Sequence, residues 1–210
     1  MQTLDHLDAL PAGALSSPAA QRNAAFILDV LRTHLPARAR VLEIAAGSGD
    51  HALAFASALP GLDWTPSDPS PEARDSLSAW RRTGPSNLRP PLAVDAADPT
   101  TWPQDRFDVV YCANMTHISP WSATEGLMDL AGRVLRRPGG LVVLYGPYRE
   151  AEVPLAPSNA TFDESLKARN PAWGLRNREA VETLARSHGL AATRRVPMPS
   201  NNLSLLFRSV

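Results

Sequence analysis

The chain has 210 residues, with 21 lysines and arginines balanced by 21 aspartates and glutamates. This length suits one domain with its own hydrophobic core, and the zero net charge offers no excess of cations for the phosphates of nucleic acid. The single cysteine, Cys112, excludes internal disulfides and indicates a reducing compartment, and neither a signal-like start nor a membrane-length apolar run is present. We therefore expect a cytoplasmic protein that binds neither nucleic acid nor membrane.

Segments with helical and strand-like apolar spacing alternate along the chain. Expected helices cover residues 24–35, 52–59, 72–82, 122–136 and 178–188. Expected strands cover residues 41–44, 62–67, 88–94, 107–112, 141–145, 190–196 and 203–207. Because parallel strands need crossover helices, the alternation predicts an α/β fold with a doubly wound, seven-stranded sheet. The short link between the last two strands predicts a mostly parallel sheet that ends in an antiparallel strand.

The connection after the strand at 141–145 is longer than ordinary loops, running from Gly146 to about Arg176. Long loops inside compact domains are usually lids or binding segments. We expect a single domain over residues 1–210, in which residues 147–176 form a lid-like insertion that covers a pocket.

A glycine turn follows the first expected strand and precedes a helix. Glycine lets a ligand approach the backbone at Gly47-Ser48-Gly49, and the helix start supplies free N–H donors. Acidic residues also stand at strand ends, where the ligand crevice of an open α/β sheet lies: Glu43, Asp68 and Asp95. Asp68 suits ribose hydroxyls and Asp95 suits an adenine amino group, although aspartate is also a common helix cap and turn former. The glycine pattern alone fits several nucleotide cofactors.

These residues resemble the class I S-adenosylmethionine-dependent methyltransferases. The resemblance is carried by residues 41–49, by Asp68 and Asp95, and by the terminal strand pair. The chain is also similar to a family of small methyltransferase-like proteins of undetermined substrate, through residues 64–68, 114–121, 144–148 and 198–202. It departs from that family's usual residues at Ala46, Ser48, Asp50 and Asn177.

The resemblance implies the fold and S-adenosylmethionine as cofactor. It also implies that Arg22 and Asn23 close the methionine end of the cofactor pocket, where a guanidinium can bind a carboxylate bidentately. The residues expected to bind the cofactor are Arg22, Asn23, Glu43, Ala45, Gly47, Gly49, His51, Asp68, Asp95, Ala96 and Asn114.

Catalytic candidates follow the strand at 107–112 and end the strand at 141–145. His117 is a candidate general base, because methyl transfer requires an aligned acceptor that has lost its proton where necessary. Its alternative role is to shape the loop through backbone hydrogen bonds. Asn114 and Tyr145 are the other catalytic candidates.

A polar and aromatic acceptor pocket is expected between the lid and the last strand. The residues expected to bind the acceptor are Trp121, Tyr148, Ser158, Asn159, Phe162, Arg176, Asn201 and Asn202, with Trp173 beside them. Lid packing by the aromatic residues and turn formation by the asparagines are the alternatives.

The predicted function is methyl transfer from S-adenosylmethionine to a small molecule. One cysteine and five scattered histidines lack metal-ligand spacing, so no metal site is expected. The alternatives are a nicotinamide-dependent oxidoreductase, which the glycine pattern allows, and a non-catalytic cofactor-binding protein that acts through a partner. The sequence predicts neither the acceptor atom nor the oligomeric state.

Overall fold

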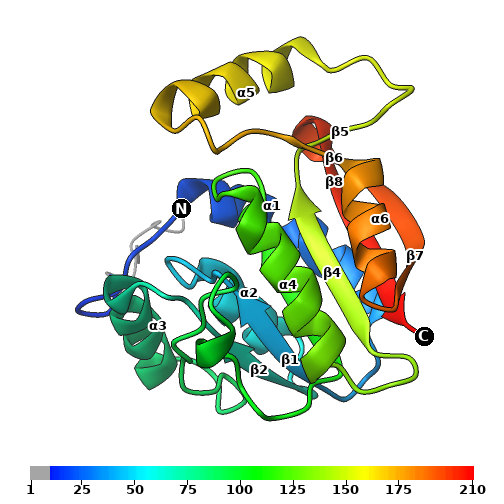
Figure 1. The fold of residues 1–210 in the computed structure, drawn as a ribbon. Helices are drawn as coiled ribbons and strands as arrows, with labels where there is room; N and C mark the ends of the chain where they lie inside the picture. Colours follow the sequence, from blue (N-terminus) through cyan, green and yellow to red (C-terminus); the bar gives the residue numbers. More distant parts are fainter. Residues whose placement is uncertain (1–9) are drawn as a thin grey trace, which may run out of the picture.

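The fold is a six-stranded sheet with helices on both faces (Figure 1), described here by a computed structural model that covers residues 10–210. The strand order is β2-β1-β3-β4-β8-β7. β2, β1, β3 and β4 pair in parallel, and β8 runs antiparallel to both of its neighbours. The strands are β1 (Ala39–Ile44), β2 (Leu62–Pro66), β3 (Val109–Ala113), β4 (Leu141–Gly146), β7 (Leu190–Met198) and β8 (Asn202–Ser209). The predicted doubly wound α/β fold is confirmed.

Each face of the sheet has its own apolar core, because successive side chains on a strand point to opposite faces. Leu42 and Ile44 pack with one core, and Val41 packs with the other. Residues of α4 and α6 belong to the first core, and residues of α1, α2 and α3 belong to the second. These helices are α1 (Pro18–His34), α2 (Asp50–Ala58), α3 (Pro71–Thr83), α4 (Trp121–Val134) and α6 (Arg178–Ser187).

The expected strand at 88–94 does not form a continuous strand, which corrects the predicted count of seven. The segment runs beside β2 and makes two isolated parallel bridges, from Leu88 to Trp64 and from Leu92 to Ser67. Pro90 and Pro91 lie between the bridges and have no N–H to donate, so the ladder is interrupted there. The segment still occupies the edge position beyond β2.

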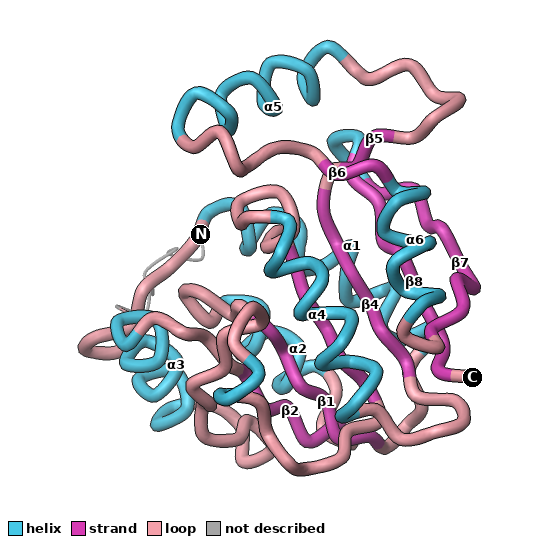
Figure 2. Tube along the Cα trace, in the orientation of Figure 1, coloured by secondary structure: helices cyan, strands magenta, loops and turns pink. Residues whose placement is uncertain are grey.

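The expected lid at 147–176 contains a helix that the sequence pattern did not predict, α5 (Pro157–Arg169). Loops flank α5 on both sides (Figure 2), and α5 lies beyond the end of the sheet toward which the β4 arrow points (Figure 1). Two short strands, β5 (Tyr148–Arg149) and β6 (Arg176–Asn177), pair in parallel where the chain leaves and rejoins the body.

A buried carboxylate in the middle of α5, that of Asp163, attaches the helix to the rest of the insertion. Asp163 is 2% exposed and accepts hydrogen bonds from Arg149, from Lys167 and from the Leu175 N–H at 2.6, 2.6 and 2.7 Å. Although burial acts to raise the pKa of Asp163, these three donors hold it below its ordinary value. The helix is thereby tied to both ends of the insertion.

The first helix begins at Pro18, six residues earlier than expected, because Ser17 caps it and proline suits its first turn. Asp50 at the start of α2 fixes this entry by accepting hydrogen bonds from the Ser16 hydroxyl, the Ser17 N–H and the Gln21 amide. The segment before α1 is therefore held against the glycine turn.

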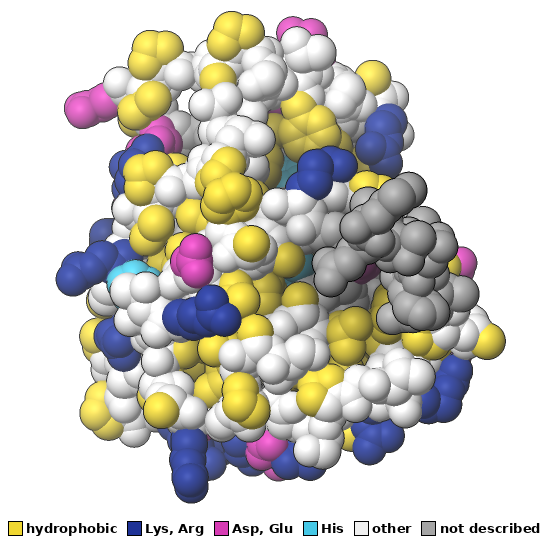
Figure 3. Space-filling model, turned by 180° about the vertical axis from the view of Figure 1, so that it is seen from behind, with side chains coloured by type: hydrophobic (Ala, Val, Ile, Leu, Met, Phe, Trp, Pro, Cys, Tyr) yellow, Lys and Arg dark blue, Asp and Glu magenta, His cyan; other side chains and the backbone are white. Residues whose placement is uncertain are grey.

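The outer surface mixes charges of both signs. Seen from behind, basic side chains lie along the lower edge with acidic ones among them (Figure 3). Within residues 10–210, no helix combines the length and apolarity needed to cross a bilayer.

Candidate functional site

A cavity of about 830 Å³ lies at the carboxyl ends of β3 and β4. Residues of α1, of α5 and of the turn before β8 also line it. This volume lies in the range of about 300–1,000 Å³ typical of small-molecule sites. The lining residues are Ser17, Ala19, Arg22, Asn23, Phe26, Asn114, His117, Tyr145, Pro147, Asn159, Phe162, Pro199, Ser200 and Asn202.

Eight of the residues predicted from the sequence meet in this cavity although they come from five separate segments. They are Arg22, Asn23, Asn114, His117, Tyr145, Asn159, Phe162 and Asn202. The topology explains the convergence, because β3 and β4 are adjacent parallel strands whose carboxyl ends meet at one edge.

The loop after β3 presents Asn114 and His117 to the cavity. Asn114 adopts a positive φ of 61°, and its N–H donates to the Tyr145 carbonyl at 2.8 Å, which turns the chain sharply at the strand end. Asparagine tolerates this left-handed conformation better than most residues do.

The His117 ring is 3% exposed, and its Nδ1 is buried without a hydrogen-bond partner. Burial and, to a smaller extent, the positive charge of Arg176 together lower the pKa of His117 to about 4. The imidazole is therefore neutral at physiological pH. Phe162 of α5 packs edge-to-face against it with ring centroids 5.5 Å apart, so α5 holds the ring from the lid side.

Arg176 lies behind this loop and outside the cavity lining. Its guanidinium donates to the carbonyl oxygens of Thr116 and Ser119 at 2.9 and 2.6 Å and stands over the Trp121 ring. The expected acceptor-binding residues Arg176 and Trp121 thus lie where they shape the loop that carries His117. The Gly174 N–H adds a bond of 3.0 Å to the His117 carbonyl.

The glycine turn lies next to the carboxylates predicted beside it. The Gly47 N–H donates to Asp68 Oδ2 at 2.9 Å, and the Ser70 N–H donates to Asp68 Oδ1 at 2.9 Å. Gly47 has a positive φ of 55°, and a Cβ there would meet no atom within 4 Å, so its backbone is open to a ligand. Gly49, in contrast, lies against Trp80, which leaves no room for a side chain.

Glu43 is buried at the end of β1, with Oε2 accepting from the Trp64 indole N–H at 2.7 Å. Burial raises the pKa of Glu43 to about 7; the Trp64 hydrogen bond lowers it, and the charge of Asp68 raises it. Glu43 and Asp68 therefore lie close enough to interact. Ala45, two residues on, takes a positive φ of 56° and starts the turn.

Asp95 and Ala96 form the turn that ends the interrupted segment beside β2. Asp95 Oδ1 accepts from the Ala97 N–H at 2.8 Å, so this carboxylate has the turn-forming role that is common for aspartate. Ala96 is 4% exposed, and a Cβ at Gly126 of α4 would collide with its carbonyl oxygen. The turn is thus packed tightly onto α4.

His51 lies behind the cavity wall, buried between α1 and β3. Its Nε2 is 2.6 Å from Asn23 Oδ1, and its Nδ1 is 3.3 Å from the Tyr111 hydroxyl. Burial lowers the pKa of His51 to about 4.

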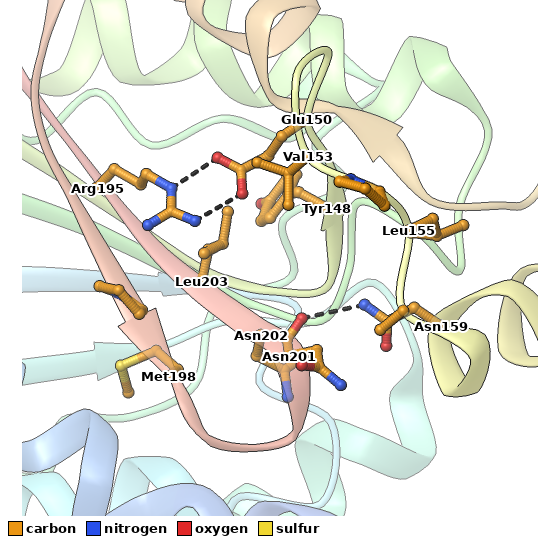
Figure 4. Close-up of a pocket in the computed structure, with 13 residues that line it drawn as sticks. Tyr148, Glu150, Val153, Leu155, Asn159, Arg195, Met198, Asn201, Asn202 and Leu203 are labelled. Carbon is orange, nitrogen blue, oxygen red and sulfur yellow. Dashed lines mark hydrogen bonds and ion pairs between the residues drawn. The ribbon is translucent and has the colours of Figure 1, made fainter.

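Asn159 and Asn202 line both the large cavity and a smaller one of about 190 Å³, whose lining is drawn in Figure 4. Asn159 donates to the Asn201 carbonyl at 3.0 Å, and a bidentate Arg195–Glu150 pair lies on the far side of the small cavity. The expected acceptor-binding residues Tyr148 and Asn201 line only this smaller space. The Ser158 hydroxyl accepts from the Asn201 amide at 3.3 Å, and Trp173 packs beneath Arg169.

Sequence reasoning missed several lining residues, including Phe26, Pro147 and Ser200. Phe26 lies on α1 and is 49% exposed. An apolar residue that the helix directs toward a cavity looks the same in a sequence as one that it directs toward the core.

In the described part of the chain, the cavity lining has a positive formal charge and no negative one. Among the lining residues, which all lie within residues 10–210, Arg22 is the only one with a formal charge, and no carboxylate is present. The cluster of four lining asparagines supplies neutral donors and acceptors: Asn23, Asn114, Asn159 and Asn202. In the same described range, no three histidine, cysteine or acidic side chains gather as a metal site would require.

The chain matches one family model and is similar in fold to several solved structures. The model of the family described as "Protein of unknown function (DUF938)" matches residues 14–209. An O-methyltransferase family protein from Burkholderia thailandensis is similar in structure, with a TM-score of 0.76 and 18% identity over 91% of this chain and 57% of that one. An O-methyltransferase family 2 protein from Planctomyces limnophilus, solved in complex with apigenin, has a TM-score of 0.76 and 19% identity over 91% of this chain and 58% of that one.

The methyltransferase CalO1 of calicheamicin biosynthesis, solved with S-adenosylhomocysteine bound, has a TM-score of 0.70 and 19% identity over 89% of this chain and 54% of that one. The chain thus spans little more than half the length of these solved structures. At such identities the likeness establishes the fold.

Proposed function

Since the chain belongs to the DUF938 family and has the fold of the class I methyltransferases, we propose that it transfers a methyl group from S-adenosylmethionine to a small-molecule acceptor. One observation carries the proposal. An open glycine turn and a cavity lined by the buried His117 imidazole lie at the same edge of the sheet.

The residues at this edge fit the cofactor chemically. When bound, S-adenosylmethionine supplies a methyl group on a positively charged sulfur. Each oxygen of Asp68 accepts one backbone N–H and has lone pairs left for ribose hydroxyls. Arg22 and Asn23 of α1 offer donors suited to a carboxylate.

The charges of the cavity favour a neutral or anionic acceptor. A cationic acceptor would add a positive charge beside Arg22 and the sulfonium, and no lining carboxylate would balance it. Neutral amides and the rings of Phe26 and Phe162 suit a flat molecule that carries hydroxyl or carbonyl groups. We therefore propose an uncharged or anionic hydroxyl, enol, thiol or carboxylate compound as the acceptor class.

His117 is the proposed general base, and Asn114 and Tyr145 are proposed to orient the reacting groups. The pKa of about 4 keeps the His117 ring in the unprotonated form that a general base requires and also makes it a weak base, so it suits an acceptor that loses its proton readily. Residues 147–176 are proposed to act as a lid that excludes water, since Phe162 of α5 packs directly on this ring.

Calorimetric titration with S-adenosylhomocysteine tests the proposal. The wild-type protein should bind it saturably, and Asp68→Asn should weaken binding by about tenfold, the value of one charge-assisted hydrogen bond. Asp75→Asn, an exposed position on α3, is the matched control and should bind as the wild type does. Folded wild-type protein that binds NADH and fails to bind S-adenosylhomocysteine would instead favour the oxidoreductase.

A further inference from the structure

A buried chain of hydrogen bonds connects β3 to the cavity through α2 and α1. The Tyr111 hydroxyl is 3.3 Å from His51 Nδ1, and His51 Nε2 is 2.6 Å from Asn23 Oδ1. Tyr111 is fully buried and His51 is 6% exposed, so water does not substitute for either partner. Of these residues, only Asn23 lines the cavity.

The directions of these bonds follow from the chemistry of their neighbours. An amide oxygen only accepts, and His51 Nε2 faces Asn23 Oδ1 at 2.6 Å. Nε2 therefore carries the proton, and Nδ1 accepts from the Tyr111 hydroxyl. The ring also stacks on Phe55 with centroids 5.1 Å apart, which fixes its plane.

This arrangement decides which end of the Asn23 amide faces the cavity. Because Asn23 Oδ1 accepts the hydrogen bond from His51, the two protons on Asn23 Nδ2 point toward the cavity. One neighbour there is Tyr145, which lines the same cavity as Asn23 and whose phenol oxygen can accept a hydrogen bond. The cavity therefore receives a donor from Asn23 next to the guanidinium of Arg22.

We propose that His51 is a positioning residue, which holds the Asn23 amide with its donor group turned toward the anionic, amino-acid end of the ligand. The inference rests on the proposed cofactor. In it, His51 acts on the cofactor through Asn23 and does not contact the cofactor itself. A flipped Asn23 amide would present a carbonyl oxygen to a carboxylate, and two acceptors repel.

Two probes separate this role from a general packing role. S-adenosylhomocysteine carries the carboxylate, whereas 5′-methylthioadenosine has the same adenosine and thioether but lacks the amino-acid group. His51→Leu should weaken binding of S-adenosylhomocysteine by about tenfold or more, while its affinity for 5′-methylthioadenosine should change by less than about twofold. His51→Gln should retain most of the affinity, because its amide nitrogen can donate in place of Nε2.

A double-mutant cycle tests whether His51 acts through Asn23. If it does, His51→Leu added to Asn23→Ala should have no further effect on binding of S-adenosylhomocysteine. The nitrogen chemical shifts of His51 should also report a protonated Nε2 and an unprotonated Nδ1.

The outcomes distinguish this inference from the proposed function. If the wild type binds neither probe, the proposed function itself fails. If the wild type binds both, the inference is overturned when His51→Leu weakens them equally or leaves both unchanged. Additive losses in the cycle would overturn it as well.

Discussion

Replacing Glu43 by glutamine should reveal the free-energy cost of one buried carboxylate. Glu43 is 2% exposed, and its pKa rises from 4.5 to about 7, chiefly because burial disfavours the charge. At about 1.4 kcal/mol per tenfold change in an ionisation constant, this pKa difference corresponds to about 3 kcal/mol.

The direction in which pH changes the unfolding free energy depends on whether the folded or the unfolded chain holds the Glu43 proton. Between pH 4.5 and about 7 the folded protein keeps the Glu43 proton that the unfolded chain releases, so rising pH favours unfolding. Below this window both states are protonated, and above it both are ionised. Glutamine cannot ionise and keeps an oxygen for the Trp64 indole. The unfolding free energy of Glu43→Gln minus that of the wild type should therefore rise by about 3 kcal/mol across the window and then level off.

Two buried histidines titrate in the same range with the opposite sign. Burial lowers the pKa values of His51 and His117 from 6.5 to about 4, so each contributes stability that is gained as pH rises. Both proteins contain these histidines, so their contributions cancel in the difference.

The assay is urea unfolding, followed by tryptophan fluorescence, from about pH 5 to about pH 8. Glu164→Gln, an exposed position on α5, should give a difference that does not change with pH. A pH-independent difference for Glu43→Gln would refute the reasoning, because it would mean that Glu43 titrates with an ordinary pKa.

Two further substitutions test the segments that border the cavity. Asp163→Asn should weaken the attachment of α5 by about 1.5–3 kcal/mol, because a neutral amide cannot replace a carboxylate that accepts from two cations and the Leu175 N–H. Amide hydrogen exchange should then accelerate in residues 157–177 and not in β1; unchanged protection of α5 would count against the anchor. Asp50→Ala should speed protease cleavage within residues 10–17, since it removes the acceptor for the Ser17 N–H and two neighbouring side chains. Cleavage as slow as in Asp75→Ala would contradict this role.

The sheet could be predicted from the sequence because buried strands read as apolar runs. The interruption at Pro90 and Pro91 was not predicted, because the apolar run outweighed the two prolines, although proline cannot join a ladder as a donor. α5 could not be predicted, because its buried residues include the polar Asn159 and Asp163 and it lacks an apolar stripe.

Eight of the residues predicted for the candidate site line one cavity, whereas their contacts could not be predicted from the sequence. Asn114 and His117 follow a strand end, which is a local signal for the ligand edge. The roles of His51 and Arg176 depend on partners 28 and 60 positions away in the chain. Residue type and spacing do not reveal such partners, so the sequence could not separate a ligand-binding role from a supporting one.

The clamp that Arg176 forms on the Thr116 and Ser119 carbonyls has a consequence for assembly. Four core strands and the glycine turn are complete before residue 147, yet the loop that carries His117 takes its shape from a side chain that is synthesised and docked much later. A nascent or truncated chain that ends before residue 176 would contain the parallel half of the sheet without the side chain that donates to these two carbonyls. The hydrogen bonds that hold the cavity-lining loop are thus completed only when nearly the whole polypeptide is in place.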